Sequence, residues 1–334
     1  MTFPLDSKPP AAKSARLWDR WPGQVARWVL GVAPFIWLAG RVNFAHVWQN
    51  LLGIDRRYLL SAFVAFGLSV VSGAARWRVL LQAFGGRSVP PLGTLFVHNL
   101  VGIYFNVLPS GFVGDAVRGY RVRQVVDDLA TSYTIVVIER LSGLLGLLLI
   151  ALIPALAQPE LRSGTMGLAL DVALAVGVAA ALVGLMLPRE LAVRPNLRAQ
   201  LARIPIAGPL MLRLKPMPDL SRLVSATFFS VCAQVFAVLG VVLLAQPLAP
   251  QASPLAVASV TPMAVLLTYV PITPAALGQR EAVFVYVLGL AGVPGEAAIT
   301  TSLLMFALSM GYAAVGAGFY FAERISGARG NLAP

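Results

Sequence analysis

Long apolar runs alternate with short arginine-rich segments along most of the chain. A helix needs about 20 apolar residues to cross the hydrocarbon core of a bilayer. By that measure, the sequence predicts membrane-spanning helices at roughly 25–43, 57–76, 132–157, 165–187, 222–246 and 296–322. Residues 1–24 form a polar leader, and no small-residue cleavage site follows the first apolar run, so we expect that run to be retained as a span.

Two further apolar stretches, at about 90–117 and 255–292, are interrupted by residues that break helices. The interrupting residues are Pro109, Gly111 and Gly114 in the first stretch, and Pro262, Pro271, Pro274 and Gly278 in the second. We interpret both stretches as re-entrant hairpins that enter and leave the membrane on one face. Irregular backbone is tolerated at membrane depth only where protein or a water-filled cavity surrounds it, so the hairpins predict an internal polar cavity. Their similar patterns also favour an inverted repeat.

The basic residues decide how these segments thread through the membrane. Most of the 26 Lys and Arg residues fall in the cytoplasm if the amino terminus is cytoplasmic and the two hairpins enter from opposite faces, the first from the cytoplasm. We therefore expect an all-α polytopic membrane protein with about six transmembrane helices and two re-entrant hairpins. It would lie in the inner membrane with both termini cytoplasmic. In this threading Arg76 and Arg78 lie in a cytoplasmic loop, and Trp77 is an interface anchor.

One integral membrane domain is expected over residues 25–323. Within it, the basic segment 189–219 contains four prolines that prevent one long helix, and we expect it to lie on anionic head groups. A plain basic loop that only fixes the topology is the alternative. Residues 324–334 would form a cytoplasmic tail.

The composition supports a membrane protein and argues against other classes. The chain is 58% hydrophobic and 12% charged, with a mean hydropathy of +0.78. Its net charge of +12 is carried mainly by arginines between apolar spans, not by a soluble basic face with aromatic residues, so no nucleic-acid partner is expected. Two histidines and one cysteine cannot supply a His/Cys zinc site without carboxylates, and we expect no metal and no cofactor.

Six ionisable residues lie in or against the apolar stretches and are the candidate substrate-binding residues. They are Asp115, Arg118, Glu139, Arg140, Arg280 and Glu281. A charge at the bilayer centre costs roughly 2.5–3.5 kcal/mol even on insertion scales, so such residues usually face partners, water or substrate. We expect all six to meet in one wet pocket between the hairpins.

The first two motifs leave alternatives open. Arg118 follows Asp115 by one helical turn and is the better candidate for a substrate phosphate, whereas Asp115 could simply cap a helix. Glu139 and Arg140 are neighbours that point about 100° apart on a helix, so each needs a partner on another element. Those partners could form a structural salt bridge, or Glu139 could be protonated and carry a proton.

The third motif places Arg280 and Glu281 where the second arm of the second hairpin begins. Glu281 suits the amino-terminal end of a helix, but Arg280 opposes the helix dipole there. Arg280 therefore needs a bound anion or an acidic partner, for which Glu139 is the candidate.

These motifs resemble those of the flippase-like membrane domain found at the amino terminus of bacterial lysylphosphatidylglycerol synthases. The matching residues are Asn106, Pro109, Gly114, Asp115 and Arg118, then Glu139 and Arg140, then Pro271, Pro274, Gly278, Arg280 and Glu281. Val113 and Ala276 stand where that family has glycines. The resemblance implies movement of modified or anionic lipids between leaflets.

Lipid translocation through a polar intramembrane cavity is therefore the expected function, with membrane lipids as partners. The chain ends at Pro334, which leaves no room for a synthase domain, and we expect no enzymatic activity. The alternatives are an intramembrane enzyme acting on a lipid-linked phosphate or sugar, and a scaffold for a lipid-modifying enzyme. A homo-oligomer is compatible with each. No GxxxxGK[ST] motif is present, so a gradient or the lipid concentrations themselves would have to drive transport.

Overall fold

A computed structural model describes residues 43–85, 88–106, 113–122, 125–126, 129–157, 172, 174–186, 196, 219–268 and 278–330. The regular elements in this part of the chain are all helices. They are α3 (Phe44–Gly53), α4 (Arg56–Ala83), α5 (Leu92–Asn106), α6 (Val113–Val122), α7 (Leu129–Ala157), a helix at Leu174–Met186, α11 (Leu220–Ala245), α12 (Pro254–Thr268), α13 (Gln279–Gly289) and α14 (Gly295–Gly330). The all-α fold class is confirmed.

Helices long and apolar enough to cross a membrane confirm four of the predicted spans. They are Arg56–Ala83, Thr131–Leu152, Leu220–Ala245 and Gly295–Glu323. The predicted span 165–187 is described as the shorter apolar helix Leu174–Met186. The predicted span 25–43 lies outside the described residues except for Asn43, and nearly all of the basic segment 189–219 also lies outside them. Helix α14 continues to Gly330, so the expected tail at 324–334 begins inside a helix.

Helix α4 extends beyond its predicted end at residue 76. The residues that follow include Trp77, Leu80 and Leu81, which are fully buried against the bundle. The helix ends only at Phe84 and Gly85, where Gly85 takes a φ of 77° that favours glycine. The expectation that Arg76 lies in a loop is therefore wrong, because the helix carries it inside the bundle.

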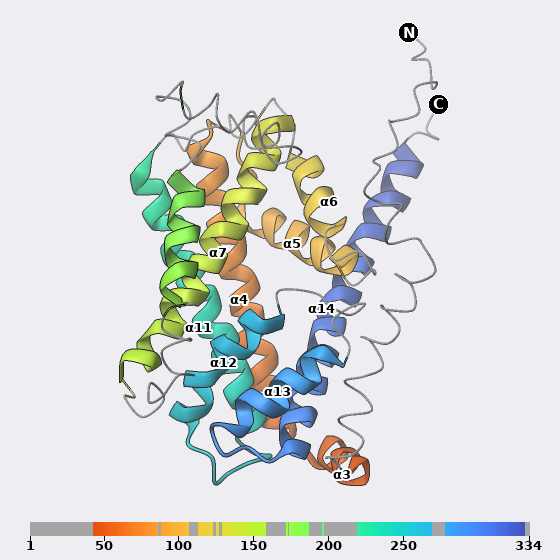
Figure 1. Cartoon of the computed structure of the whole chain (residues 1–334). Coiled ribbons are helices and arrows are strands. Elements are labelled where there is room, and N and C mark those ends of the chain that lie inside the picture. The colour runs from red at the N-terminus through yellow and green to blue at the C-terminus, as the bar shows by residue number, and fades with distance from the viewer. Residues whose placement is uncertain are drawn as a thin grey trace, which may run out of the picture.

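Each broken stretch forms two short helices, and the two pairs lie at opposite ends of the bundle (Figure 1). At the upper end of the view, α4 ends and α7 begins, with α5 and α6 between them in sequence. At the lower end, α11 ends and α14 begins, with α12 and α13 between them. This arrangement agrees with two re-entrant hairpins that enter from opposite faces. Pro109, Gly111, Pro271 and Pro274 fall between the arms, outside the described residues.

The described residues assigned to break the hairpins act in different ways. Gly114 lies inside α6, where an added Cβ would be 2.1 Å from the carbonyl oxygen of Gly102, so it permits close contact between α5 and α6. Gly278 has a φ of 75° and precedes α13, as a break requires. Pro262 lies within α12, and the second stretch is interrupted only after Thr268.

Each hairpin is joined across its arms and packs on its own core. In the first, the backbone N–H of Gly114 donates to Asn106 Oδ1 at 3.0 Å. In the second, Gln279 Nε2 donates to the carbonyl of Leu267 at 3.2 Å. One core holds Trp77, Leu80, Leu95, Ile135 and Leu148, and the other holds Val241, Val260, Ala264, Phe284 and Leu288. The hairpins are thus fixed to different parts of the bundle.

Candidate functional site

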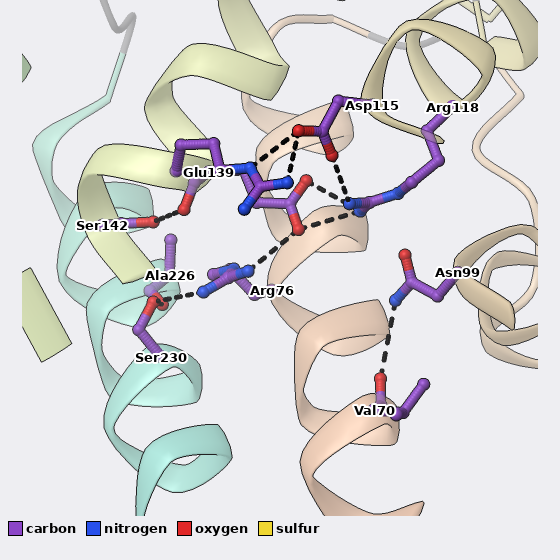
Figure 2. Close-up of polar contacts among 10 residues, drawn as sticks. Val70, Arg76, Asn99, Asp115, Arg118, Glu139, Ser142, Ala226 and Ser230 are labelled. Atoms are coloured by element: carbon purple, nitrogen blue, oxygen red, sulfur yellow. Dashed lines mark hydrogen bonds and ion pairs between the residues drawn. The ribbon is translucent and has the colours of Figure 1, made fainter. Parts of the chain in front are cut away.

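Four of the six predicted site residues meet between α4, α6 and α7, together with Arg76 (Figure 2). Arg118 Nη2 donates to both oxygens of Glu139, each at 2.8 Å. Arg76 Nη2 donates to Glu139 Oε1 at 2.9 Å. Arg140 Nε donates to Asp115 Oδ2 at 2.8 Å, and Arg118 Nη1 lies 3.7 Å from Asp115 Oδ1. We call these five residues the arginine network.

The arginine network is buried except at one edge. Glu139 is 4% exposed and Asp115 is 7% exposed, whereas the side chain of Arg140 is 47% exposed. The five residues contribute three guanidinium groups and two carboxylates. Guanidinium groups bind phosphate and carboxylate oxygens, and Arg140 forms the accessible edge of the network.

Helical geometry explains how neighbours in sequence reach different partners. Glu139 and Arg140 point about 100° apart on α7, so Glu139 meets Arg118 and Arg76 while Arg140 meets Asp115. Asp115 lies in the first turn of α6, where its charge suits the helix dipole, but α6 begins at Val113 and Asp115 is not the N-cap. The capping interpretation of Asp115 is wrong, since its carboxylate binds Arg140.

Glycines provide the space that the guanidinium groups occupy. An added Cβ at Gly102 on α5 would lie 2.5 Å from Arg118 Cδ. An added Cβ at Gly143, one turn after Glu139 on α7, would lie 2.9 Å from Arg76 Nη1. Because real Cβ atoms do not approach so closely, both positions need glycine for the arginines to keep these places.

Sequence reasoning missed Arg76 and two of its neighbours. Arg76 Nη1 donates to Ser230 Oγ on α11 at 3.1 Å, and the guanidinium of Arg118 lies 4.5 Å above the ring of Trp77. Trp77 is fully buried, so its interpretation as an interface anchor is wrong. The apolar residues after Arg76 were the available signal. They place Arg76 about 10 Å from the end of α4 at 1.5 Å per residue, too deep for a loop.

Buried polar atoms without a hydrogen-bond partner concentrate on α4, α5, α6 and α7, which carry or adjoin the arginine network. In the described part of the chain they are Arg76 Nε, Trp77 Nε1, His98 Nδ1, Asn99 Oδ1, Asp115 Oδ1, Arg118 Nε and Ser132 Oγ, with Gln246 Oε1 elsewhere. Such an atom costs about 1–3 kcal/mol when nothing satisfies it, and native proteins usually supply water or a ligand. These helices therefore have unused capacity to bind polar groups.

Arg280 and Glu281 form a separate group in the second hairpin. Glu281 Oε2 accepts from the backbone N–H of Gly278 at 2.7 Å, and Glu281 Oε1 accepts from Arg280 Nη2 at 2.5 Å. Arg280 Nε also donates to Ser302 Oγ on α14 at 2.9 Å, and its guanidinium lies 4.8 Å above Phe306. We call Arg280 and Glu281 the hairpin pair, which Ser302 supports. Its net charge is zero.

The expected pair of Arg280 with Glu139 does not form, because Arg280 uses its own neighbour as its acidic partner. Among the described residues, no hydrogen bond or ion pair joins Arg280 or Glu281 to the arginine network. The structure thus brings Asp115, Arg118, Glu139 and Arg140 together. It places the other two predicted residues in a second group. Over the same described residues, no set of three or more His, Cys, Asp or Glu side chains could hold a metal ion.

The helices and their charges define the class of protein. It is a multi-pass membrane protein in which a buried arginine–carboxylate network connects a hairpin to spanning helices. The chain belongs to the lysylphosphatidylglycerol synthase TM region family, whose sequence model matches residues 24–316. This match includes all three motifs and confirms the resemblance seen in the sequence. No curated protein sequence matches the chain.

Proposed function

We propose that this protein moves a phosphate-bearing or modified lipid between membrane leaflets, with the arginine network as its head-group site. The observation that carries the proposal is the cluster of three guanidinium groups, of which Arg140 is half exposed, because guanidinium groups bind phosphate oxygens. Membership of a family named for the membrane region of a lipid-modifying synthase supports a lipid substrate.

The proposed first step is an exchange of anions on the arginines. Arg118 already holds a carboxylate through two bonds of 2.8 Å, and the same planar group binds phosphate oxygens equally well. An incoming phosphate meets the half-exposed Arg140 first and then replaces Glu139 on Arg118. Glu139 keeps Arg76 as its partner, so no carboxylate is left buried and unpaired during the exchange.

The hairpins supply the route in this proposal. They enter from opposite ends of the bundle, so the arginine network lies at the first hairpin and the neutral hairpin pair fixes the second hairpin at the other end. The lipid tails remain in the surrounding hydrocarbon. The positive-inside rule, applied to the whole chain, favours a cytoplasmic location for the end of α4 that carries Arg76 and Arg78, and we propose the inner membrane as the location.

Arg118→Lys tests this function most directly. Lysine keeps the positive charge but loses the fork that holds two oxygens at once, so we expect lipid transfer in liposomes to fall roughly tenfold or more. Arg57→Lys is the matched control, because Arg57 is exposed at the start of α4. Transfer at the normal rate by the Arg118 variant would contradict the proposal.

The same liposomes separate translocation from other activities. Mass spectrometry of the lipids after incubation should show unchanged masses, because a translocator alters position only. A change of mass would favour an intramembrane enzyme. If the purified protein neither moves nor alters lipid, a scaffold for a lipid-modifying partner becomes the better explanation. Arg280→Gln in this assay measures whether the hairpin pair takes part in transfer.

A further inference from the structure

A cavity lies on a different side of α4 from the arginine network. Its volume is about 490 Å³, and it is bounded by α4, the start of α5 and α11. Its walls are mainly apolar and include Val71, Ala75, Val79, Leu92 and Phe229, with Arg78 and Gln82 as its polar members toward the end of α4. It is therefore amphipathic, with an apolar body and a cationic end.

Arg78 is the unusual member of this cavity. Its side chain is exposed, and within the described part of the chain it makes neither a hydrogen bond nor an ion pair. Arg76, two residues earlier, binds Glu139 and Ser230 through its two Nη atoms. Residues that are two positions apart on a helix point about 200° apart, so α4 directs the Arg76 guanidinium into the bundle and the Arg78 guanidinium into the cavity.

A second cation contacts the cavity wall. Arg222 of α11 donates through Nη1 to Gln82 Oε1 at 3.1 Å, so its guanidinium lies against a residue that lines the cavity. Arg222 Nε also lies 4.0 Å from Asp219, and neither Arg222 nor Asp219 lines the cavity itself. The guanidinium of Arg78 at the end of an apolar wall matches a molecule with an anionic head and an apolar tail.

We propose that this cavity binds an anionic phospholipid of the surrounding bilayer, with its phosphate on Arg78 and an acyl chain along Val71, Ala75 and Phe229. The cavity volume lies within the range of about 300–1,000 Å³ typical of small-ligand pockets. A free phosphate ion would leave the apolar wall unused. Guanidinium groups near a membrane surface attract anionic lipids, which adds to the affinity.

The position of the cavity suits the proposed transport. The biological role of the cavity rests on that proposed function, but its binding of a lipid does not. Ser72 in the cavity wall lies one turn before Arg76, and Phe229 immediately precedes Ser230, which binds Arg76. A lipid held here is therefore next to the helices that carry the arginine network. The cavity would act as a loading position from which the head group passes to that network.

Photo-crosslinking with a lipid probe tests binding without transport. The protein in nanodiscs would receive phosphatidylglycerol carrying a diazirine in its acyl chain, and digestion would map the adducts to peptides of α4 and α11. We expect Arg78→Gln to lower the yield on these peptides about fivefold, the effect of losing one surface charge near anionic lipid. Arg56→Gln, at the exposed opposite end of α4, is the matched control and should leave the yield unchanged.

Two further experiments identify the class of ligand. Ala75→Phe fills the cavity without changing charge and should also lower the yield, whereas an excess of inorganic phosphate should not compete. Equal yields from the native protein and both cavity variants would overturn the proposal, and so would competition by free phosphate. The Arg118→Lys variant should keep normal crosslinking while losing transfer, so failure of the cavity and failure of the transport function give different results.

Discussion

The two hairpins hold their buried charges in different ways. At the first, Arg118 of α6 binds Glu139 of α7, which also binds Arg76 of α4, so the arginine network exists only when these three helices are assembled. In the second, Glu281 takes its partners from the preceding residues Gly278 and Arg280, and among the described residues Ser302 is its one partner from another helix. Similar residue types therefore produce one long-range group with three guanidinium groups and one local, neutral group.

This difference separates the proposed roles of the two groups. A neutral pair that also closes the start of its own helix is fully satisfied, which suits the fixing of a hairpin. A cluster of three guanidinium groups with several unpartnered polar atoms is suited to accept an anion. An arginine beside a carboxylate therefore indicates a binding site only where further guanidinium groups and unpartnered polar atoms gather around it.

The largest effect should come from removing the carboxylate of Glu139. Glu139→Gln leaves Arg76 and Arg118 without their anion, and breaking a buried ion pair in this way costs about 3–5 kcal/mol of unfolding free energy. Glu281→Gln removes a helix cap and a local partner, and we expect a loss of about 0.5–2 kcal/mol. Denaturant unfolding in detergent micelles measures both.

A double variant identifies the cause of that loss. Arg76→Gln combined with Glu139→Gln removes one charge of each sign, so it should be less destabilised than the sum of the two single variants. Purely additive losses would show that Arg76 and Glu139 do not interact. Equal losses for Glu139→Gln and Glu281→Gln would remove the contrast between the hairpins.

A smaller effect should follow from adding a methyl group where α5 and α6 approach closely in the first hairpin. Gly114→Ala places a Cβ 2.1 Å from the Gly102 carbonyl oxygen, so α5 and α6 must separate, at about 1–3 kcal/mol. Transfer should fall too, because Arg118 lies on α6. Gly278→Ala strains the backbone, at about 1–2 kcal/mol, because its φ is 75°.

Gly93→Ala is the matched control for that experiment. Gly93 lies on α5, and no atom lies within 4 Å of an added Cβ there. Alanine favours helix over glycine, so this variant should be unchanged or more stable by about 0.5–1 kcal/mol. If Gly114→Ala behaves like Gly93→Ala in unfolding and transfer, the close contact of α5 and α6 has no role in positioning Arg118.

The smallest effect concerns Asp219, an exposed carboxylate outside both groups that serves as a baseline. Hydrogen bonds from the side chain and backbone of Ser221 lower the pKa of Asp219 below its ordinary value. Its contribution to stability is therefore complete above the pKa of the unfolded chain and is lost as the pH falls through the lower folded pKa.

Asp219→Asn keeps a capping side chain at the start of α11 but does not titrate. The native protein should therefore lose slightly more thermal stability than this variant between roughly pH 5 and pH 2. Thermal melts in detergent at the two pH values measure the difference. Identical acid sensitivity of the two proteins would show that the cap makes no pH-dependent contribution.

Much of the fold could be predicted because hydrophobic length and helix breakers are local properties. The apolar run after Arg56 and the run before Ala245 both became spans, and the position of Gly278 marked the start of α13. The end of α4 was predicted too early because Arg76 was interpreted as a residue of a cytoplasmic loop. A charge inside an apolar run indicates either the end of a helix or a buried partner, and only the partner distinguishes them.

The sequence by itself determined that this chain is a helical membrane protein with two interrupted segments and with charges at membrane depth. Those features depend on residue type and spacing along the chain. Only the tertiary structure decided that Arg76 shares Glu139 with Arg118, and that Arg280 turns to its neighbour Glu281. The physical reason is that the charge of a site depends on which helices pack together. That choice follows from the whole buried surface and not from any single motif.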